Sequence, residues 1–226
     1  MRALKQKILA LTILTISSSS LFAQRSPIRD PDLFIQKRVV SWKELKTQNV
    51  VMQKRDYSCG AAAVATVLRY YWGQDVTEAD VLRVIELSLR PAALKDRSQN
   101  GLTMADLKVA CDRMDYAAAV GKLDTFKELA ESKVPVVVSA KLGGIDHFVV
   151  FRGTACGLVF LADPIRGNIR LTVSDFVKAW NENAIFVVAL EGKTKSAVSR
   201  LGLRADEVQL GYLNNQVVRR QLSLGK

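Results

Sequence analysis

Apolar and polar positions change their spacing about halfway along the chain, and the first half has the pattern of helices. Residues 59–72 are apolar on most sides and precede Gly73, which is typical of a buried helix that ends at a glycine. The stretch TEAD, which begins at Thr77, has the spacing of a capping box, and Thr103 begins another amphipathic run. The polar residues 90–100 between these runs are expected to form a loop.

The second half has the pattern of antiparallel strands. Short runs rich in β-branched and aromatic residues are bounded there by Gly, Asp, Asn and Pro. These runs are residues 134–141, 147–152, 158–162, 168–173 and 184–190. Brief helices are expected at residues 124–132 and 174–180. Helices followed by antiparallel strands predict an α+β domain.

The N-terminus has the three parts of a secretory signal peptide. A basic head, MRALKQK, precedes an apolar stretch of about nine residues and a small-residue exit at Ala23, so the mature chain should begin near Gln24. The alternative is an uncleaved anchor, although the stretch is too short to span a bilayer and no transmembrane domain is expected in the mature chain. The predicted parts are a signal peptide, an N-terminal arm, a globular domain and a basic C-terminal tail: residues 1–23, 24–49, 50–190 and 191–226. The arm should contain a strand at residues 36–41, and the tail fits either a packed helix or a mobile segment.

Composition limits the kinds of partner and cofactor. Apolar residues make up 49% of the chain, which is enough for a packed core. The net charge is +11, yet the basic residues are scattered and carry no recognition motif, so no nucleic-acid partner is expected. The chain has one histidine and three cysteines, none with metal-ligand spacing, and the cysteines are too few for a disulfide framework. Neither a metal nor another cofactor is predicted.

Cys59 is the candidate nucleophile because it begins the buried helix. The first turn of a helix has free N–H groups and a positive dipole end, and both favour the thiolate. The alternative is that Cys59 is one more small apolar residue of the core. Cys111 lies on the apolar side of its own helix and is expected in the core, whereas Cys156 should be exposed at the tip of a hairpin.

His147 is the only histidine, so any cysteine–histidine chemistry must use it. The strands on either side of Ala155 predict a hairpin, and a loop centred there would place His147 directly opposite Asp163 on the same face. The carboxylate would then orient the imidazole ring and stabilise its protonated form. Alternatively, His147 is an ordinary polar residue at a strand start, and Asp163 begins a turn together with the proline that follows it.

Attack on a peptide carbonyl also requires donors for the oxyanion. The backbone N–H of Cys59 is one, and the carboxamide of Gln53, six residues upstream, is the second candidate. The segment KLGGID is expected to be a flexible turn that leads into the next strand. Its residues Gly143, Gly144 and Asp146 are the candidates for lining a cleft that binds an extended substrate.

Together these motifs resemble the bacteriocin-processing, double-glycine leader peptidases, which are papain-like cysteine peptidases. The segments QKRDYSCGAAA, GLTMADLKVA, DHFVVF and ADP carry the resemblance, which covers residues 50–190. It implies a papain-like fold in which an N-terminal helical half packs on a C-terminal antiparallel sheet. It implies that Cys59 is the nucleophile and that His147 is the base and acid. It also implies that Asp163 orients the histidine and that Gln53 donates to the oxyanion. One departure is Ser58, which stands where the family usually has an acidic residue before the cysteine.

The order of a signal peptide, a peptidase-like domain and a short basic tail is similar to that of stand-alone periplasmic peptidases of bacterial functional-amyloid secretion systems. This resemblance implies peptide or unfolded protein substrates, with amyloid subunits and an outer-membrane pore as partners. The leading hypothesis is an exported cysteine endopeptidase that acts through an acyl-enzyme. Two alternatives stay open: a non-catalytic module that holds unfolded secretion substrates in its cleft, and a transpeptidase that passes the acyl group to an amine.

Overall fold

The structure is a computed structural model of the chain, and it describes residues 25–30, 33–38, 41–190, 199–205 and 207–208. The predicted signal peptide, residues 1–23, lies outside the described residues, as does most of the predicted tail. The chain divides into two compact units, Met1–Trp42 and Lys43–Lys226.

The described part of the first unit is a β-hairpin. The strands β1 (Arg25–Asp30) and β2 (Leu33–Arg38) pair antiparallel. The predicted strand of this arm therefore exists, slightly earlier than expected, and it has a partner strand. The sequence of β1, RSPIRD, contains a proline and three charged residues, so the pattern of apolar positions does not reveal it.

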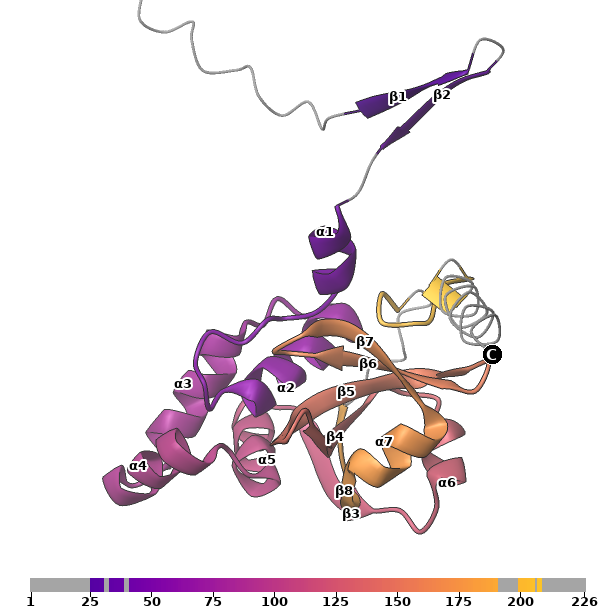
Figure 1. The fold of residues 1–226 in the computed structure, drawn as a ribbon. Helices are drawn as coiled ribbons and strands as arrows, with labels where there is room; N and C mark the ends of the chain where they lie inside the picture. Colours follow the sequence, from indigo (N-terminus) through magenta and orange to yellow (C-terminus); the bar gives the residue numbers. More distant parts are fainter. Residues whose placement is uncertain (1–24, 31–32, 39–40, 191–198, 206, 209–226) are drawn as a thin grey trace, which may run out of the picture. The chain divides into compact units, whose positions relative to one another are not determined.

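The second unit is built on a six-stranded sheet with the strand order β3-β8-β4-β5-β6-β7 (Figure 1). Its strands are β3 (Ala117–Lys122), β4 (Val136–Leu142), β5 (Ile145–Ala155), β6 (Leu158–Asp163), β7 (Gly167–Thr172) and β8 (Trp180–Ala189). Every strand pair is antiparallel, which confirms the predicted α+β class. Only β3 of these strands was not predicted, because its sequence AAAVGK has a single β-branched residue.

Helices occupy most of the first half of this unit. They are α1 (Trp42–Thr47), α2 (Cys59–Tyr70), α3 (Glu78–Ser88), α4 (Pro91–Asn100), α5 (Met104–Arg113), α6 (Phe126–Ala130) and α7 (Val173–Ala179). Both predicted capping residues, Thr77 and Thr103, accept a hydrogen bond from the backbone N–H three residues later. The predicted capping box of α3 and the predicted helix start at Thr103 are therefore confirmed, and α5 also has a capping box, which was not predicted.

The prediction of a loop at residues 90–100 is wrong, because this stretch forms α4. The helix has Pro91 in its first turn and ends at Gly101, whose φ of 87° suits glycine. None of its residues is buried, so it has no apolar stripe that a periodic pattern could show. Arg97 in its last turn pairs with Asp106 of α5 at 2.6 Å, which ties the exposed helix to its neighbour.

Helices lie on both faces of the sheet (Figure 1), and each face is covered by an apolar layer. One layer joins α2, α3 and α5 to strand residues such as Val150, and the other joins α6 and α7 to residues such as Val149 and Phe151. Neighbouring residues of β5 thus enter opposite layers, as the alternation of a strand requires. Leu201, beyond the predicted domain, is 1% exposed and belongs to the first layer.

Candidate active site

Cys59 is the first residue of α2, and its thiol lies against β5. Burial raises the pKa of this thiol above its ordinary value, and the charge of Asp163 adds to the effect. The backbone N–H groups of Phe148 and Gly60 oppose it by hydrogen bonding to the sulfur. The helix start therefore does not by itself produce a thiolate, in contrast to the expectation from the helix dipole, because desolvation outweighs the N–H donors. Since Phe148 follows His147, the thiol lies beside the strand that carries the histidine.

His147 and Asp163 form a buried hydrogen-bonded pair. Nε2 of the ring lies 3.0 Å from Oδ2 of the carboxylate, and the two side chains are 2% and 0% exposed. A carboxylate only accepts, so Nε2 carries the proton. Nδ1 lies 3.1 Å from the carbonyl oxygen of Ile145, which accepts a proton bound at that nitrogen. The doubly protonated ring thus has an acceptor for each N–H, as a group that takes and returns a proton requires.

The carboxylate of Asp163 is held in its ionised form. Burial raises its pKa, but the hydrogen bond and charge of His147 and the N–H groups of Ile165 and Arg166 outweigh burial, so the pKa lies below its ordinary value. Oδ1 accepts from the N–H of Ile165 at 2.7 Å and from that of Arg166 at 3.1 Å. One oxygen is therefore fixed by backbone, and the other is directed at the histidine.

The prediction that His147 lies directly opposite Asp163 is wrong, because the two residues are not paired across the strands. The prediction that they lie on the same face of the sheet is correct. The β5–β6 turn consists of Cys156 and Gly157, so that Ala155 pairs with Leu158 rather than forming the centre of the loop. A β-bulge then leaves Arg152 unpaired, because Phe151 opposes Leu161 while Gly153 opposes Phe160.

This bulge places Asp163 on the same face of the sheet as His147. Beyond it Val150 pairs with Ala162, and the same register continued by one residue sets Asp163 opposite Val149. His147 lies two residues before Val149 and so on the same face. Without the extra residue, the two side chains would point to opposite faces of the sheet.

Gln53 is held next to the acid by a backbone contact. Its N–H donates to the carbonyl oxygen of Pro164 at 2.9 Å, which places the loop before α2 against the residue that follows Asp163. The side-chain oxygen of Gln53 is buried and has no hydrogen-bond partner among the described residues. This oxygen only accepts hydrogen bonds, so the donor to an oxyanion would be the amide nitrogen of the same side chain. All four residues predicted for the chemistry thus converge on β5 and on the end of β6.

The predicted substrate-binding residues lie at the start of β5. Gly143 and Gly144 form the two-residue turn between β4 and β5, and their φ angles of 60° and 84° fit a type I′ turn. Asp146 lines a cavity of about 510 Å³ together with Phe148 and Asn181, and its Oδ1 accepts from Nδ2 of Asn181 at 2.9 Å. Cys59 does not line this cavity, but Phe148 links the two, because its side chain forms part of the wall and its N–H faces the thiol of Cys59.

Two polar residues of the site were missed by the sequence analysis. Arg166 donates from Nη1 to Oδ2 of Asp163 at 3.1 Å, and Glu78 accepts the N–H of Lys54, in the loop before α2, at 2.9 Å. The contact of Glu78 joins segments that are far apart in the sequence, whereas Arg166 lies in the same turn as Asp163 and reaches a distant segment only through the carbonyl oxygen of Leu142. The spacing of three between Asp163 and Arg166 was the only signal, and it is too common to indicate a site.

The other cysteines are where the sequence predicted them. Cys111 is buried, Cys156 is exposed, and all three cysteines are free thiols. Within residues 41–190 and the other described ranges, no cluster of His, Cys, Asp and Glu side chains is large enough to hold a metal ion. Over the same ranges, no helix has both the length and the apolar character needed to cross a bilayer.

Comparison with known proteins identifies the family. Residues 47–191 match the model of the peptidase C39 family. The chain belongs to this family. It is therefore a cysteine peptidase, and the match spans the predicted domain with all four of its chemically active candidates. Family membership favours catalysis over the non-catalytic binding module.

Curated relatives from two pseudomonads match much of the chain. It is 36% identical over 164 residues to a protein of Pseudomonas fluorescens named probable functional amyloid protease FapD, which covers 72% of this chain and 70% of that protein. It is 30% identical over 192 residues to the protein of the same name from Pseudomonas aeruginosa, with 85% and 81% covered. The resemblance to peptidases of functional-amyloid systems is thus confirmed at the level of sequence similarity.

Solved structures confirm the papain-like C39 fold. The peptidase domain of Streptococcus ComA, a bifunctional ABC transporter involved in quorum sensing, superposes with a TM-score of 0.52 at 18% identity and covers 63% of this chain and 98% of its own. A double-glycine-motif protease from an AMS/PCAT transporter, solved in complex with the leader peptide, gives a TM-score of 0.51 at 19% identity, with 64% and 95% covered.

Proposed function

We propose that this C39 peptidase is an exported endopeptidase that cleaves extended segments of secreted, amyloid-type partner proteins. The relatives named as functional amyloid proteases support this substrate class. The solved relative in complex with a leader peptide supports an extended peptide as substrate. The signal-peptide pattern of residues 1–23 supports export to the periplasm, where amyloid subunits and an outer-membrane pore would be the partners.

The contact between His147 and Asp163 beside the Cys59 thiol carries the proposed mechanism. Asp163 holds Nε2–H, which leaves Nδ1 to take the proton of the thiol. The thiolate attacks the carbonyl carbon of the scissile bond, and the oxyanion accepts hydrogen bonds from the N–H of Cys59 and the carboxamide of Gln53. Because the thiol is buried, the thiolate forms as its proton moves to the ring.

Collapse of the tetrahedral intermediate breaks the peptide bond. The protonated His147 gives its proton to the leaving amine, and the acyl group stays on Cys59 as a thioester. The same ring then takes a proton from water, and the resulting hydroxide attacks the thioester carbonyl. Loss of the thiolate and return of the proton restore the starting state and release the carboxylic acid. An amine in place of this water would give transpeptidation.

The substrate is proposed to lie across the start of β5. The cavity that Phe148 links to Cys59 lies between Met104 of α5 and Asn181 of β8, with Asp146 and Phe148 in its wall. A cavity of about 510 Å³ has room for a side chain of an extended peptide next to the scissile bond. The turn of Gly143 and Gly144 borders the same strand, so Asp146 and these glycines are the proposed substrate contacts.

The proposal is tested with an unfolded amyloid-type polypeptide and with a peptide that contains a Gly-Gly pair. Both are incubated with the wild-type protein, with Cys59→Ala and with Cys156→Ala, a control that removes an exposed thiol in the β5–β6 turn. Mass spectrometry should detect cleavage by the wild type and the control and a loss of at least about 1,000-fold in Cys59→Ala. Equal cleavage by Cys59→Ala would sink the assignment of the nucleophile. Product masses separate hydrolysis from transfer to an added amine.

Export is tested separately by fractionation of cells that express the full chain. The expected result is a periplasmic protein whose N-terminal sequencing begins near Gln24. A protein that retains residues 1–23 and stays with the membrane fraction would support the anchor instead.

A further inference from the structure

Arg166, in the turn between β6 and β7, shares the acid of the site with the histidine. Its Nη1 donates to Oδ2 of Asp163 at 3.1 Å, the same oxygen that accepts from Nε2 of His147 at 3.0 Å. Nη1 also lies 3.4 Å from Nε2 itself. The carboxylate is fully buried, while the Arg166 side chain is 31% exposed, so the guanidinium closes the outer side of the pair.

The second arm of the guanidinium holds the neighbouring turn. Nη2 of Arg166 donates to the carbonyl oxygen of Leu142, the last residue of β4, at 2.9 Å. A Cβ atom added to Gly143 would lie 2.7 Å from this Nη2, so the missing side chain of the glycine leaves the space that the guanidinium occupies. Besides forming the turn, Gly143 thus leaves room for the guanidinium of Arg166.

These contacts leave the carboxylate of Asp163 little freedom to rotate. Two backbone N–H groups hold Oδ1, while Arg166 and His147 hold Oδ2. The turn that Arg166 grips leads directly into the first residues of β5, where His147 lies. A planar guanidinium can bridge two acceptors on different segments at once, and the point charge of a lysine cannot.

We propose that Arg166 is a positioning residue of the peptidase site, which holds the Asp163 carboxylate and the β4–β5 turn so that the ring of His147 keeps one orientation toward Cys59. The inference rests on the proposed roles of Cys59, His147 and Asp163. An Arg166 that only stabilised the fold would change unfolding but not the reactivity of the thiol.

The test uses two ways of removing the guanidinium. Arg166→Met removes its donors while keeping a long side chain, and Gly143→Ala pushes the flexible end of Arg166 away through the new methyl group. Gly157→Ala is the matched control for Gly143→Ala, because its φ is also positive, at 75°, but nothing lies within 4 Å of its Cβ position. Arg166→Lys restores the charge without the bridge.

The first readout is the rate at which iodoacetamide alkylates Cys59, assigned by peptide mapping so that Cys111 and Cys156 are counted apart. We expect Arg166→Met and Gly143→Ala to slow this reaction by about 10- to 100-fold, and Arg166→Lys to fall between them and the wild type. Gly157→Ala should react as the wild type does. Gly143→Ala should add little to Arg166→Met in the double variant, since both act through one group.

The second readout is peptide cleavage by Arg166→Met, where kcat should fall by a similar factor with KM within about twofold; KM is not compared for Gly143→Ala, because Gly143 is itself a proposed substrate contact. Wild-type alkylation rates in both Arg166→Met and Gly143→Ala would overturn the inference, as would losses that only follow a lower midpoint of urea unfolding. Alkylation requires no substrate, so this result stands even when no peptide is cleaved. Cleavage by Cys59→Ala, by contrast, would remove the proposed function and leave the alkylation comparison intact.

Discussion

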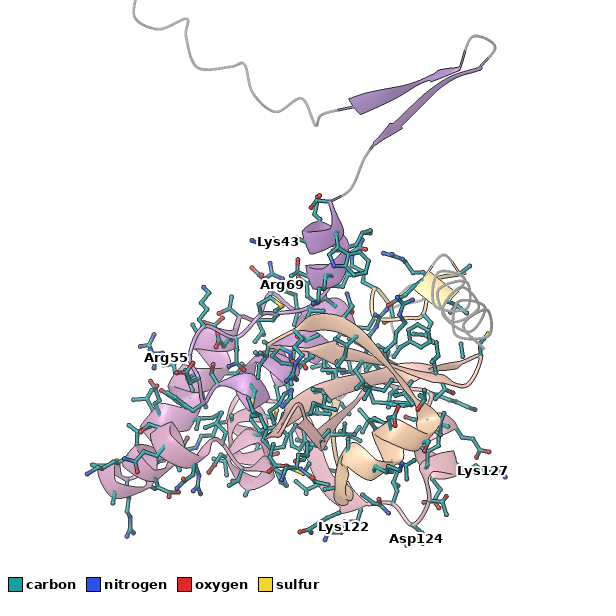
Figure 2. The ribbon with its side chains drawn as sticks, in the orientation of Figure 1. Lys43, Arg55, Arg69, Lys122, Asp124 and Lys127 are labelled. Atoms are coloured by element: carbon teal, nitrogen blue, oxygen red, sulfur yellow. The ribbon has the colours of Figure 1, made fainter. Side chains whose placement is uncertain are left out.

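The carboxylate of Glu78 accepts the hydroxyl of Ser58, so the first residue of α3 is bound to the residue before Cys59. Both side chains are buried, at 4% and 0% exposure. The same Oε1 accepts the N–H of Lys54 at 2.9 Å. Nearby, Arg55, which is labelled in Figure 2, pairs with Glu86 of α3 at 2.7 Å. An acidic group therefore lies beside position 58 after all, supplied by another helix rather than by the residue before the cysteine.

This contact predicts that Glu78→Ala loosens the loop that carries Gln53 and Cys59. The variant leaves the N–H of Lys54 without its acceptor and leaves the hydroxyl of Ser58 with the carbonyl oxygen of Arg55 alone, at 2.8 Å, so the free energy of unfolding should fall by about 1–3 kcal/mol. Alkylation of Cys59 should slow as well. Glu78→Gln is the control, because its amide oxygen can still accept both bonds. Urea unfolding and the rate of Cys59 alkylation are measured for both variants. If Glu78→Ala has the unfolding free energy and the alkylation rate of the wild type, Glu78 does not hold this loop.

Gly60 provides the close approach of α2 to β5. A Cβ atom there would lie 2.9 Å from Cδ2 of Phe148 and 3.0 Å from Cδ2 of Leu107, so the strand or the helix would have to move. Gly60→Ala should therefore lower the free energy of unfolding by about 1–3 kcal/mol, despite the better helix propensity of alanine, and it should reduce cleavage. The control is Gly121→Ala, whose Cβ would meet Ile185 at an ordinary 3.7 Å. Gly60→Ala with wild-type stability and activity would rule out this packing constraint.

The sequence was informative wherever an element buries one face. The buried helix α2, the capped helices α3 and α5 and five of the six strands of the main sheet show regular apolar spacing or capping residues. The exposed helix α4 and the strand β3 were not predicted, because neither places apolar residues at a regular spacing.

The candidate site was predictable only in its reactive residue types. Cys59 begins α2 and Asp163 ends β6, while His147 and Gln53 are recognisable by their residue type and by their spacing from these two. Arg166 and Glu78 act through contacts between distant segments, and no spacing rule encodes such contacts. The bulge at Arg152, which sets the face shared by His147 and Asp163, is an extra residue in an otherwise regular strand, and the alternation pattern does not reveal it.

The buried thiol of Cys111 makes the free energy of unfolding depend on pH in the alkaline range. Burial raises the pKa of this thiol to about 12, so the folded protein keeps the proton between roughly pH 9 and 12, while the unfolded chain releases it. The unfolded state then binds fewer protons, and the free energy of unfolding falls by about 1.4 kcal/mol per pH unit in that window. Below pH 9 the contribution is constant.

The matching experiment compares the wild type with Cys111→Ala by urea unfolding from pH 7 to pH 10.5. Alanine leaves a small cavity, so the variant should be the less stable protein at pH 7. The difference should shrink above pH 9, because only the wild type loses the contribution of this thiol. Tyr71, whose pKa is raised by burial alone, titrates in both proteins and cancels in the difference. A difference that stays constant up to pH 10.5 would argue against the raised pKa.

The segment that follows the family match packs on the domain at the bulge. Arg152, which is 5% exposed in its side chain, pairs with both carboxylate oxygens of Glu207, at 2.7 and 2.9 Å. Its other donors reach the carbonyl oxygens of Leu201 and Gly202, at 3.0 and 3.1 Å. The side chain that protrudes from the bulge is thus held by residues 199–208, outside the predicted peptidase domain.

Residues 199–208 should therefore be required for stability and for the active arrangement of His147 and Asp163. Leu201→Ala removes a core side chain and should cost about 2–4 kcal/mol in the free energy of unfolding, whereas the exposed Val177→Ala should stay within about 0.5 kcal/mol. A chain that ends at residue 198 should also lose the partners of Arg152 in Leu201, Gly202 and Glu207 and keep only Oδ1 of Asn168 at 2.8 Å, so Cys59 alkylation should slow even under conditions where circular dichroism shows a folded protein. A truncated chain with wild-type unfolding and alkylation would show that the bulge holds its register without this segment.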